Sequence, residues 1–151
     1  MGTRIICVGN RHMRGDDFGP RVYDCLAGQP LPAAVDLVDG GLAGLGLLRY
    51  LEDGRRVVFV DAVAGFAAQG GIVLLGADEV ARQCTGAFGH EAGLPYLLRV
   101  MPAVLDSPPP AITIIGHEGE ASAETVQAVA ELALRLATEV VTDVADDVCC
   151  V

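Results

Sequence analysis

The chain has 151 residues, a net charge of −10 and 52% hydrophobic residues, which is enough apolar material for one core in one domain. The acidic balance argues against a nucleic-acid-binding protein, because phosphate binding depends on clustered Lys and Arg. Lysine is absent and the only serines are Ser107 and Ser122, so P-loop, Schiff-base and Ser–Lys chemistries are excluded and a serine nucleophile has little support.

No apolar run reaches the roughly 18 residues needed to cross a bilayer, and the chain leads directly into a strand pattern without a signal-peptide pattern. The cysteines are odd in number and show no disulfide-framework spacing: Cys7, Cys25, Cys84, Cys149 and Cys150. We therefore expect a cytoplasmic protein that has no membrane or nucleic-acid partner.

Short apolar runs alternate with helical patterns along the chain. Strands are predicted at residues 4–8, 35–38, 57–60, 72–75 and 111–115, the fourth as an antiparallel edge strand. Helices are predicted at residues 19–27, 42–51, 78–83, 94–104 and from Ser122 to about 141. This order predicts a three-layer α/β/α sandwich with a mostly parallel sheet of about five strands, as one domain over residues 1–151 with a flexible tail at 143–151.

Polar residues follow the predicted parallel strands: Asn10, Asp39 and Asp61 each follow one strand alone, and His117 with Glu118 follows another. In open α/β sheets, ligands collect outside the carboxyl ends of the strands. The acids at this edge predict a site for a cation, most simply a metal ion. Asn10 after a glycine is explained equally well as a turn residue.

Four aspartates are candidates for chemistry. Asp16 and Asp17 precede a helix, where capping explains one acid but not two. Asp61 follows a fully apolar strand, where a carboxylate is costly unless it is paired, hydrogen-bonded or bound to metal. Asp39 has a comparable position, but the Gly–Gly that follows it also fits an Asx turn.

His90 lies between glycines in a predicted loop, so a packing role is less favoured for it. With two carboxylates, its imidazole would complete a site suited to Zn, Ni or Mn. His12 and His117 are reserve candidates because they also lie near strand ends.

Other mechanisms stay open at this point. An Asp16–Asp61 dyad could act on water, with like-charge repulsion separating the two pKa values. A Cys84–His90 nucleophilic pair is conceivable, although nothing in the sequence orients it. A dinucleotide site is weak because the glycines do not form G-x-G-x-x-G. We favour a metal, since a cation between the acids removes their repulsion.

Several short blocks of sequence, in this order and spacing, resemble the hydrogenase maturation protease family. The blocks are IICVGN followed by Asp16 and Gly19–Pro20, VDGG followed by Leu45, Leu48 and Leu51, VVFVDAV, HEAGLPYLL, and ITIIG before the last helix. The resemblance covers nearly the whole chain, to about residue 141.

The resemblance implies an endopeptidase that removes the C-terminal extension from the nickel-loaded precursor of a nickel–iron hydrogenase large subunit. It implies that Asp16, Asp61 and His90 bind the metal. Nickel would be presented by the precursor, and zinc or cadmium could occupy the same site. Asp16 and Asp61 are the predicted catalytic residues, with Asp39 as a further candidate to accept a proton.

Two departures from the family pattern matter. First, the acidic pair is spaced differently from the family pattern. If the family pattern is aligned at Asn10 or at Gly19, the metal ligand falls on Asp16, whereas alignment at the acidic pair itself places it on Asp17. The stretch GHEGE after the fifth strand also differs from the usual Gly–apolar–Gln/Glu–Pro. The alternative function is therefore a non-cleaving, nickel-sensing adaptor of the same fold, and a monomer is expected in either case.

Overall fold

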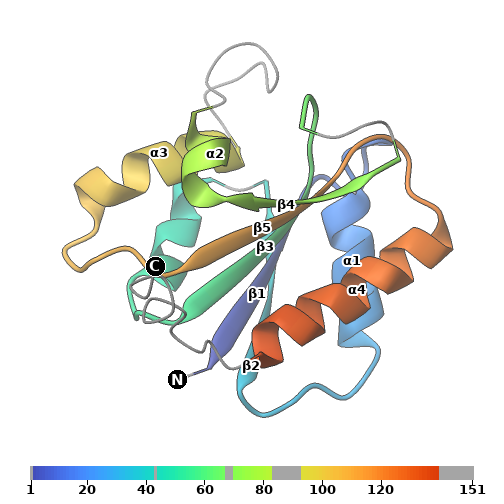
Figure 1. The fold of residues 1–151 in the computed structure, drawn as a ribbon, viewed down its shortest axis with the longest axis horizontal. Helices are drawn as coiled ribbons and strands as arrows, with labels where there is room; N and C mark the ends of the chain where they lie inside the picture. The colour runs from blue at the N-terminus through green and yellow to red at the C-terminus, as the bar shows by residue number, and fades with distance from the viewer. Residues whose placement is uncertain (1, 43, 67–69, 83–92, 140–151) are drawn as a thin grey trace, which may run out of the picture.

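The computed structural model describes residues 2–42, 44–66, 70–82 and 93–139. A five-stranded sheet with the order β2-β1-β3-β5-β4 lies between two layers of helices (Figure 1). The strands are β1 (Thr3–Val8), β2 (Val35–Gly41), β3 (Arg56–Ala62), β4 (Ile72–Gly76) and β5 (Ile112–His117). All neighbours pair in parallel except β4, which runs antiparallel to β5 at one edge. The predicted fold class and the antiparallel edge strand are confirmed.

The helices are α1 (Phe18–Ala27), α2 (Ala77–Ala81), α3 (Leu94–Val104) and α4 (Ala123–Thr138), with a 3₁₀ helix η1 (Leu45–Leu51). The helix predicted at 42–51 is thus shorter and more tightly wound than expected, because Gly44 and Gly46 weaken helix propensity at its start. As predicted, Ser122 caps α4, and its side-chain oxygen accepts the Thr125 N–H at 3.1 Å. The expected C-terminal tail lies outside the described residues.

The sheet is covered on both faces, which explains why its central strands are continuous apolar runs. Helices α1 and α4 pack on one face, with Val22, Val129 and Ala133 among the fully buried side chains. Helices α2, α3 and η1 pack on the other face, where Phe59 and Leu97 are fully buried. Among the described residues, no helix has both the length and the apolarity to cross a membrane.

Close backbone packing fixes the start of α1 against the end of β1. A Cβ atom on Gly19 would lie 2.0 Å from the carbonyl oxygen of Val8, so only glycine permits this approach. Gly9 has a φ of 146°, and a Cβ there would lie 2.3 Å from the carbonyl oxygen of Asp16. Both glycines hold the turn that carries Asp16 close to the carboxyl ends of the strands.

Candidate active site

The parallel strands β1, β3 and β5 end at the same edge of the sheet (Figure 1). Asp61 lies inside β3, where it is paired in register with Gly116 of β5. Asp16 lies in the turn between β1 and α1. The fold therefore brings two acids that are distant in sequence to one edge.

Asp61 is a deeply buried carboxylate, with 7% of its surface exposed. Burial raises its pKa well above the usual value for aspartate, and the charge of Asp16 raises it further. A hydrogen bond from the Ala62 backbone acts in the opposite direction and only partly offsets these effects. Since the charge of Asp16 raises the pKa of Asp61, the two acids belong to one electrostatic site.

Asp16 is half-buried at the mouth of this site. Its Oδ2 accepts the Asn10 N–H at 3.2 Å, and its backbone oxygen accepts the same N–H at 2.9 Å. Burial raises the pKa of Asp16, the Asn10 hydrogen bond lowers it, and the charge of Asp17 raises it. The Asn10 contact therefore orients Asp16 without neutralising it.

Asp17 has a different environment from Asp16. It is the N-cap residue of α1, although its side chain makes no capping hydrogen bond. Its carbonyl oxygen accepts the Arg21 N–H at 3.0 Å. Its charge is not among the causes that shift the pKa of Asp61. These contacts favour Asp16 as the acid coupled to Asp61, while the choice of metal ligand stays a prediction.

Asp39 is engaged by other groups. Its Oδ1 accepts the Gly41 N–H at 3.2 Å, which is the geometry of an Asx turn. Its Oδ2 lies 3.5 Å from a guanidinium nitrogen of Arg11, which also pairs with Asp24 at 3.1 Å. The role of Asp39 in proton transfer stays a prediction. The ion pair between Arg11 and Asp39 was not predicted from the sequence.

His90 and Cys84 both lie outside the described residues, so the third predicted ligand and the thiol alternative cannot be placed. Within the part of the chain that the structure describes, no three His, Cys, Asp or Glu side chains gather closely enough to hold a metal ion. The described part of the site therefore contributes a pair of acids, and a complete ligand set requires a further group.

His117, a reserve candidate, is buried to 1% exposure at the end of β5. Its ring stacks on Phe18 with centroids 4.9 Å apart and planes inclined by 25°. Its Nδ1 atom is buried, and no hydrogen-bond partner for it is found among the described residues. The sequence indicated only that a histidine ends the strand, because the stacking partner is supplied by α1. His12 is exposed, and its backbone N–H donates to Oδ1 of the Asn10 side chain at 3.0 Å.

The comparisons with known proteins agree with this architecture. A family model described as hydrogenase maturation protease matches residues 20–144. The hydrogenase maturating endopeptidase HybD from E. coli is 27% identical, with a TM-score of 0.69 over 90% of this chain and 89% of that chain. The maturation protease HycI from Thermococcus kodakarensis shares the fold at 21% identity, with a TM-score of 0.65 over 91% of this chain and 93% of that one.

A curated relative matches a shorter segment. The hydrogenase expression/formation protein HupD from Rhodobacter capsulatus is 35% identical over 77 residues, which is 50% of this chain. The match spans 37% of the length of that relative.

Proposed function

Because the chain belongs to the hydrogenase maturation protease family, we propose that it is an endopeptidase that removes the C-terminal extension from a nickel–iron hydrogenase large-subunit precursor. The observation that supports this activity most directly is the coupled pair Asp16 and Asp61 at the carboxyl edge of the sheet. Buried acids with raised pKa values are typical of catalytic sites, where they accept or donate protons near neutral pH.

The pair also suits a divalent cation. Burial and mutual repulsion disfavour two ionised carboxylates, and a cation between them offsets both effects. We propose that the nickel of the precursor is recognised here as part of the substrate, with His90 as the third ligand. Zinc or cadmium would fit the same donor set of two carboxylates and an imidazole.

The residues can support hydrolysis in two ways. In the first, a cation held by Asp16, Asp61 and His90 would supply Lewis-acid polarisation of the scissile carbonyl, and Asp61 would accept the proton of the attacking water. In the second, Asp16 and Asp61 share one proton and act on the water as a dyad. In both, the Asn10 N–H holds Asp16 in place while Asp61 supplies the basic oxygen. Asp61 is essential in each case.

The test is mass spectrometry of a nickel-loaded large-subunit precursor after incubation with the protein. We expect a C-terminal peptide to be released, and no release from nickel-free precursor. Asp16→Asn should abolish release, whereas Asp17→Asn should retain most of it, because Asp17 is not coupled to Asp61. The reverse pattern would transfer the metal-ligand role to Asp17.

Cys84→Ala serves as the control for the thiol alternative and should leave cleavage nearly intact. Loss of cleavage in this variant alone would favour the Cys84–His90 pair. An unchanged precursor mass with binding still detectable would favour the adaptor. The adaptor is not the favoured function, because the solved relatives are described as endopeptidases and proteases.

We further propose that the protein acts as a cytoplasmic monomer on its precursor. Cys7 and Cys25 are free thiols, which fits a reducing compartment. Light scattering of the purified protein should give the mass of one chain, and a dimer mass would contradict this.

A further inference from the structure

A surface pocket lies between α2 and α3, and neither Asp16 nor Asp61 is part of its lining. Its volume is about 620 Å³, within the range of roughly 300–1,000 Å³ typical of ligand sites. Its lining consists of Asp78, Ala81, Arg82, Leu98, Arg99 and Pro102. The segment that carries His90 connects α2 to α3 in the chain, so both walls of the pocket adjoin that segment in sequence.

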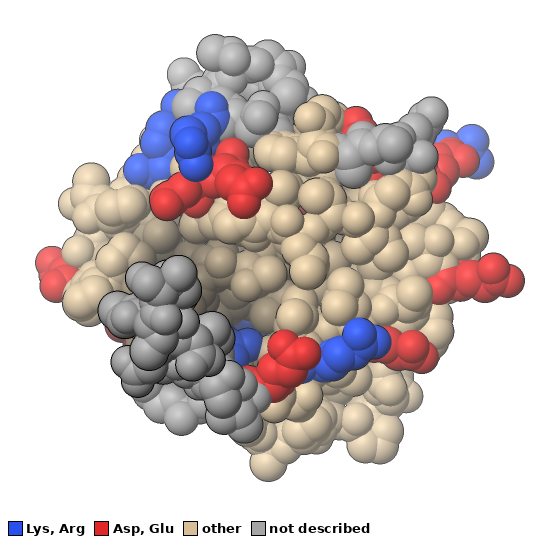
Figure 2. All heavy atoms as spheres, in the orientation of Figure 1, with Lys and Arg blue, Asp and Glu red and all other residues tan. Residues whose placement is uncertain are grey.

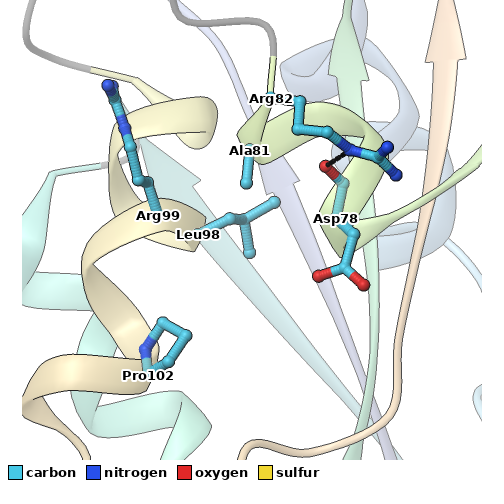
Figure 3. A pocket seen from close by; sticks show the side chains of 6 residues that line it. All are labelled: Asp78, Ala81, Arg82, Leu98, Arg99 and Pro102. Carbon is cyan, nitrogen blue, oxygen red and sulfur yellow. Dashed lines mark hydrogen bonds between the residues drawn. The ribbon is translucent and has the colours of Figure 1, made fainter.

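The floor of the pocket is apolar and its rim is charged. Figure 3 shows Leu98 and Ala81 facing each other at the centre, with Arg82 and Arg99 on opposite sides of Leu98. Leu98 is 2% exposed and therefore forms a fixed floor, whereas both arginines are exposed. An apolar group can enter between two guanidinium groups that stay in water.

The two arginines differ in their ion pairing from four of the other eight arginines in the chain. Arg4, Arg11, Arg14 and Arg55 each have a carboxylate within ion-pair distance. Within the described residues, Arg82 and Arg99 have none: Arg82 donates from Nε to the Asp78 carbonyl oxygen at 3.2 Å, and Arg99 lies 5.9 Å from the Tyr96 ring centre.

Neither Arg82 nor Arg99 is ion-paired with a carboxylate of the described residues, on a protein with a net charge of −10. In Figure 2, basic groups at the upper left border the surface over α2 and α3, next to acidic groups. Within the described part of the chain, the other donors of both guanidinium groups have no acceptor and can pair with an incoming carboxylate, although Asp78 also lines the pocket.

We propose that this pocket binds an acidic peptide segment of the precursor, with an apolar side chain on Leu98 and carboxylates at Arg82 and Arg99. The inference rests on the proposed function, since the precursor is the polypeptide that the site must hold. A docking point on the two helices that precede and follow the His90 segment in the chain would orient the precursor before cleavage. Binding energy from such a remote contact lowers KM without changing the chemical step.

The test compares charge-reversal variants by precursor cleavage kinetics. Arg82→Glu and Arg99→Glu should each raise KM by about tenfold, because an attractive contact becomes repulsive, while kcat changes less than about twofold. The increase should diminish at high salt. Arg135→Glu is the matched control, since Arg135 is exposed on α4 in the opposite layer and the change in net charge is the same.

A binding measurement separates this proposal from the proposed function. In an Asp61→Asn background, where no cleavage is expected, Arg99→Glu should weaken binding of the nickel-loaded precursor by about tenfold. If the wild-type protein cleaves the precursor and the KM values of Arg82→Glu, Arg99→Glu and Arg135→Glu are equal, the docking proposal is overturned and the proposed protease function stands. If the precursor is bound but not cleaved, and Arg99→Glu weakens this binding, the proposed protease function is overturned and the docking proposal is supported. Absence of both binding and cleavage would overturn both.

Discussion

Asp61 combines a buried position with a like charge nearby, and both disfavour its ionised form. Its pKa in the folded protein therefore lies above the value in the unfolded chain, which is near 3.9 for aspartate. Between these two values the folded state binds more protons, so stability falls as pH rises through this window and stays reduced above it. Asp61 thus lowers stability at the pH where it is expected to work.

Replacing Asp61 with Asn removes this cost. We expect Asp61→Asn to unfold at a higher temperature than wild type at pH 8, by about 3 °C for each kcal/mol gained, and to lose cleavage activity. The difference in Tm should shrink at pH 4, where the wild-type carboxyl is protonated. Calorimetry at both pH values measures this. A variant less stable than wild type at pH 8 would mean that the carboxylate has a stabilising partner.

A divalent cation should stabilise the wild-type protein through the same carboxylates. At a concentration 100 times its Kd, a ligand that binds only the folded state adds about 2.7 kcal/mol to stability. Zn²⁺ or Ni²⁺ should therefore raise Tm in the wild type and have much less effect in Asp61→Asn. Asp78→Asn is a control, because Asp78 lies in the α2–α3 pocket. Equal shifts in all three proteins would place the metal elsewhere.

At the scale of elements, the contact between β1 and α1 depends on Gly19. A Cβ at this position meets the backbone of Val8, which cannot move without disturbing the sheet. We expect Gly19→Ala to displace α1 and to destabilise the protein by about 3 kcal/mol or more, since overpacking against backbone is not relieved by a side-chain rotation. Cleavage should fall as well, because the shift moves Asp16.

Gly46→Ala provides the comparison for this prediction. Gly46 lies in η1, and a Cβ there would have open space around it. Alanine should be neutral or slightly stabilising at this position, because it restricts the unfolded chain. Urea unfolding of both variants measures the two effects. Similar free energies of unfolding for Gly19→Ala and wild type would show that α1 can relax away from β1.

The sequence predicted the strands well, and the end of β1 at Val8, but the other strands extend beyond their predicted ends. Apolar runs identify buried strands because both faces of the sheet are covered, yet pairing continues beyond the run. β3 includes Asp61 and β5 includes His117, since the backbone hydrogen bonds between strands do not depend on side-chain polarity. β2 extends to Gly41 through a register shift opposite Val8, which no local pattern indicates.

The candidate site was predictable to the extent that topology sets it. Parallel strands place their carboxyl ends together, so Asp16 and Asp61 could be assigned to one edge from sequence alone. The stacking of His117 on Phe18 and the Arg11–Asp39 ion pair join segments that are distant in the chain. The α2–α3 pocket likewise depends on how two helices pack, which residue spacing does not determine.

At the scale of the whole molecule, one sheet joins two hydrophobic clusters. The first cluster, which contains Val22, packs under α1 and α4, and the second, which contains Leu97, packs under α3 and η1. Adjacent residues of the same strands serve both clusters: Val58 points into the first and Phe59 into the second. Each face of the sheet is apolar and is covered by its own helix layer. Loss of either layer would therefore expose one apolar face of the sheet.

This shared sheet predicts a single cooperative unfolding transition, which tests the expectation of one domain. The chain has no tryptophan and three tyrosines, so tyrosine fluorescence can report on each layer. Tyr23 packs against the first cluster and Tyr50 against the second. Variants that keep only one of these tyrosines, with phenylalanine at the other positions, should give coincident urea transitions.

Core truncations sharpen this test. Leu97→Ala removes a fully buried side chain from the second cluster and should cost about 2–5 kcal/mol. Because the sheet couples the clusters, this loss should shift the Tyr23 transition on the opposite face as much as the Tyr50 transition. Val22→Ala should shift both signals in the same way, with a smaller cost because it removes two carbon atoms instead of three. If Leu97→Ala moved only the Tyr50 signal, the α3 layer would unfold independently. The helix that lines the proposed docking pocket could then open while the layer that holds the turn carrying Asp16 stays folded.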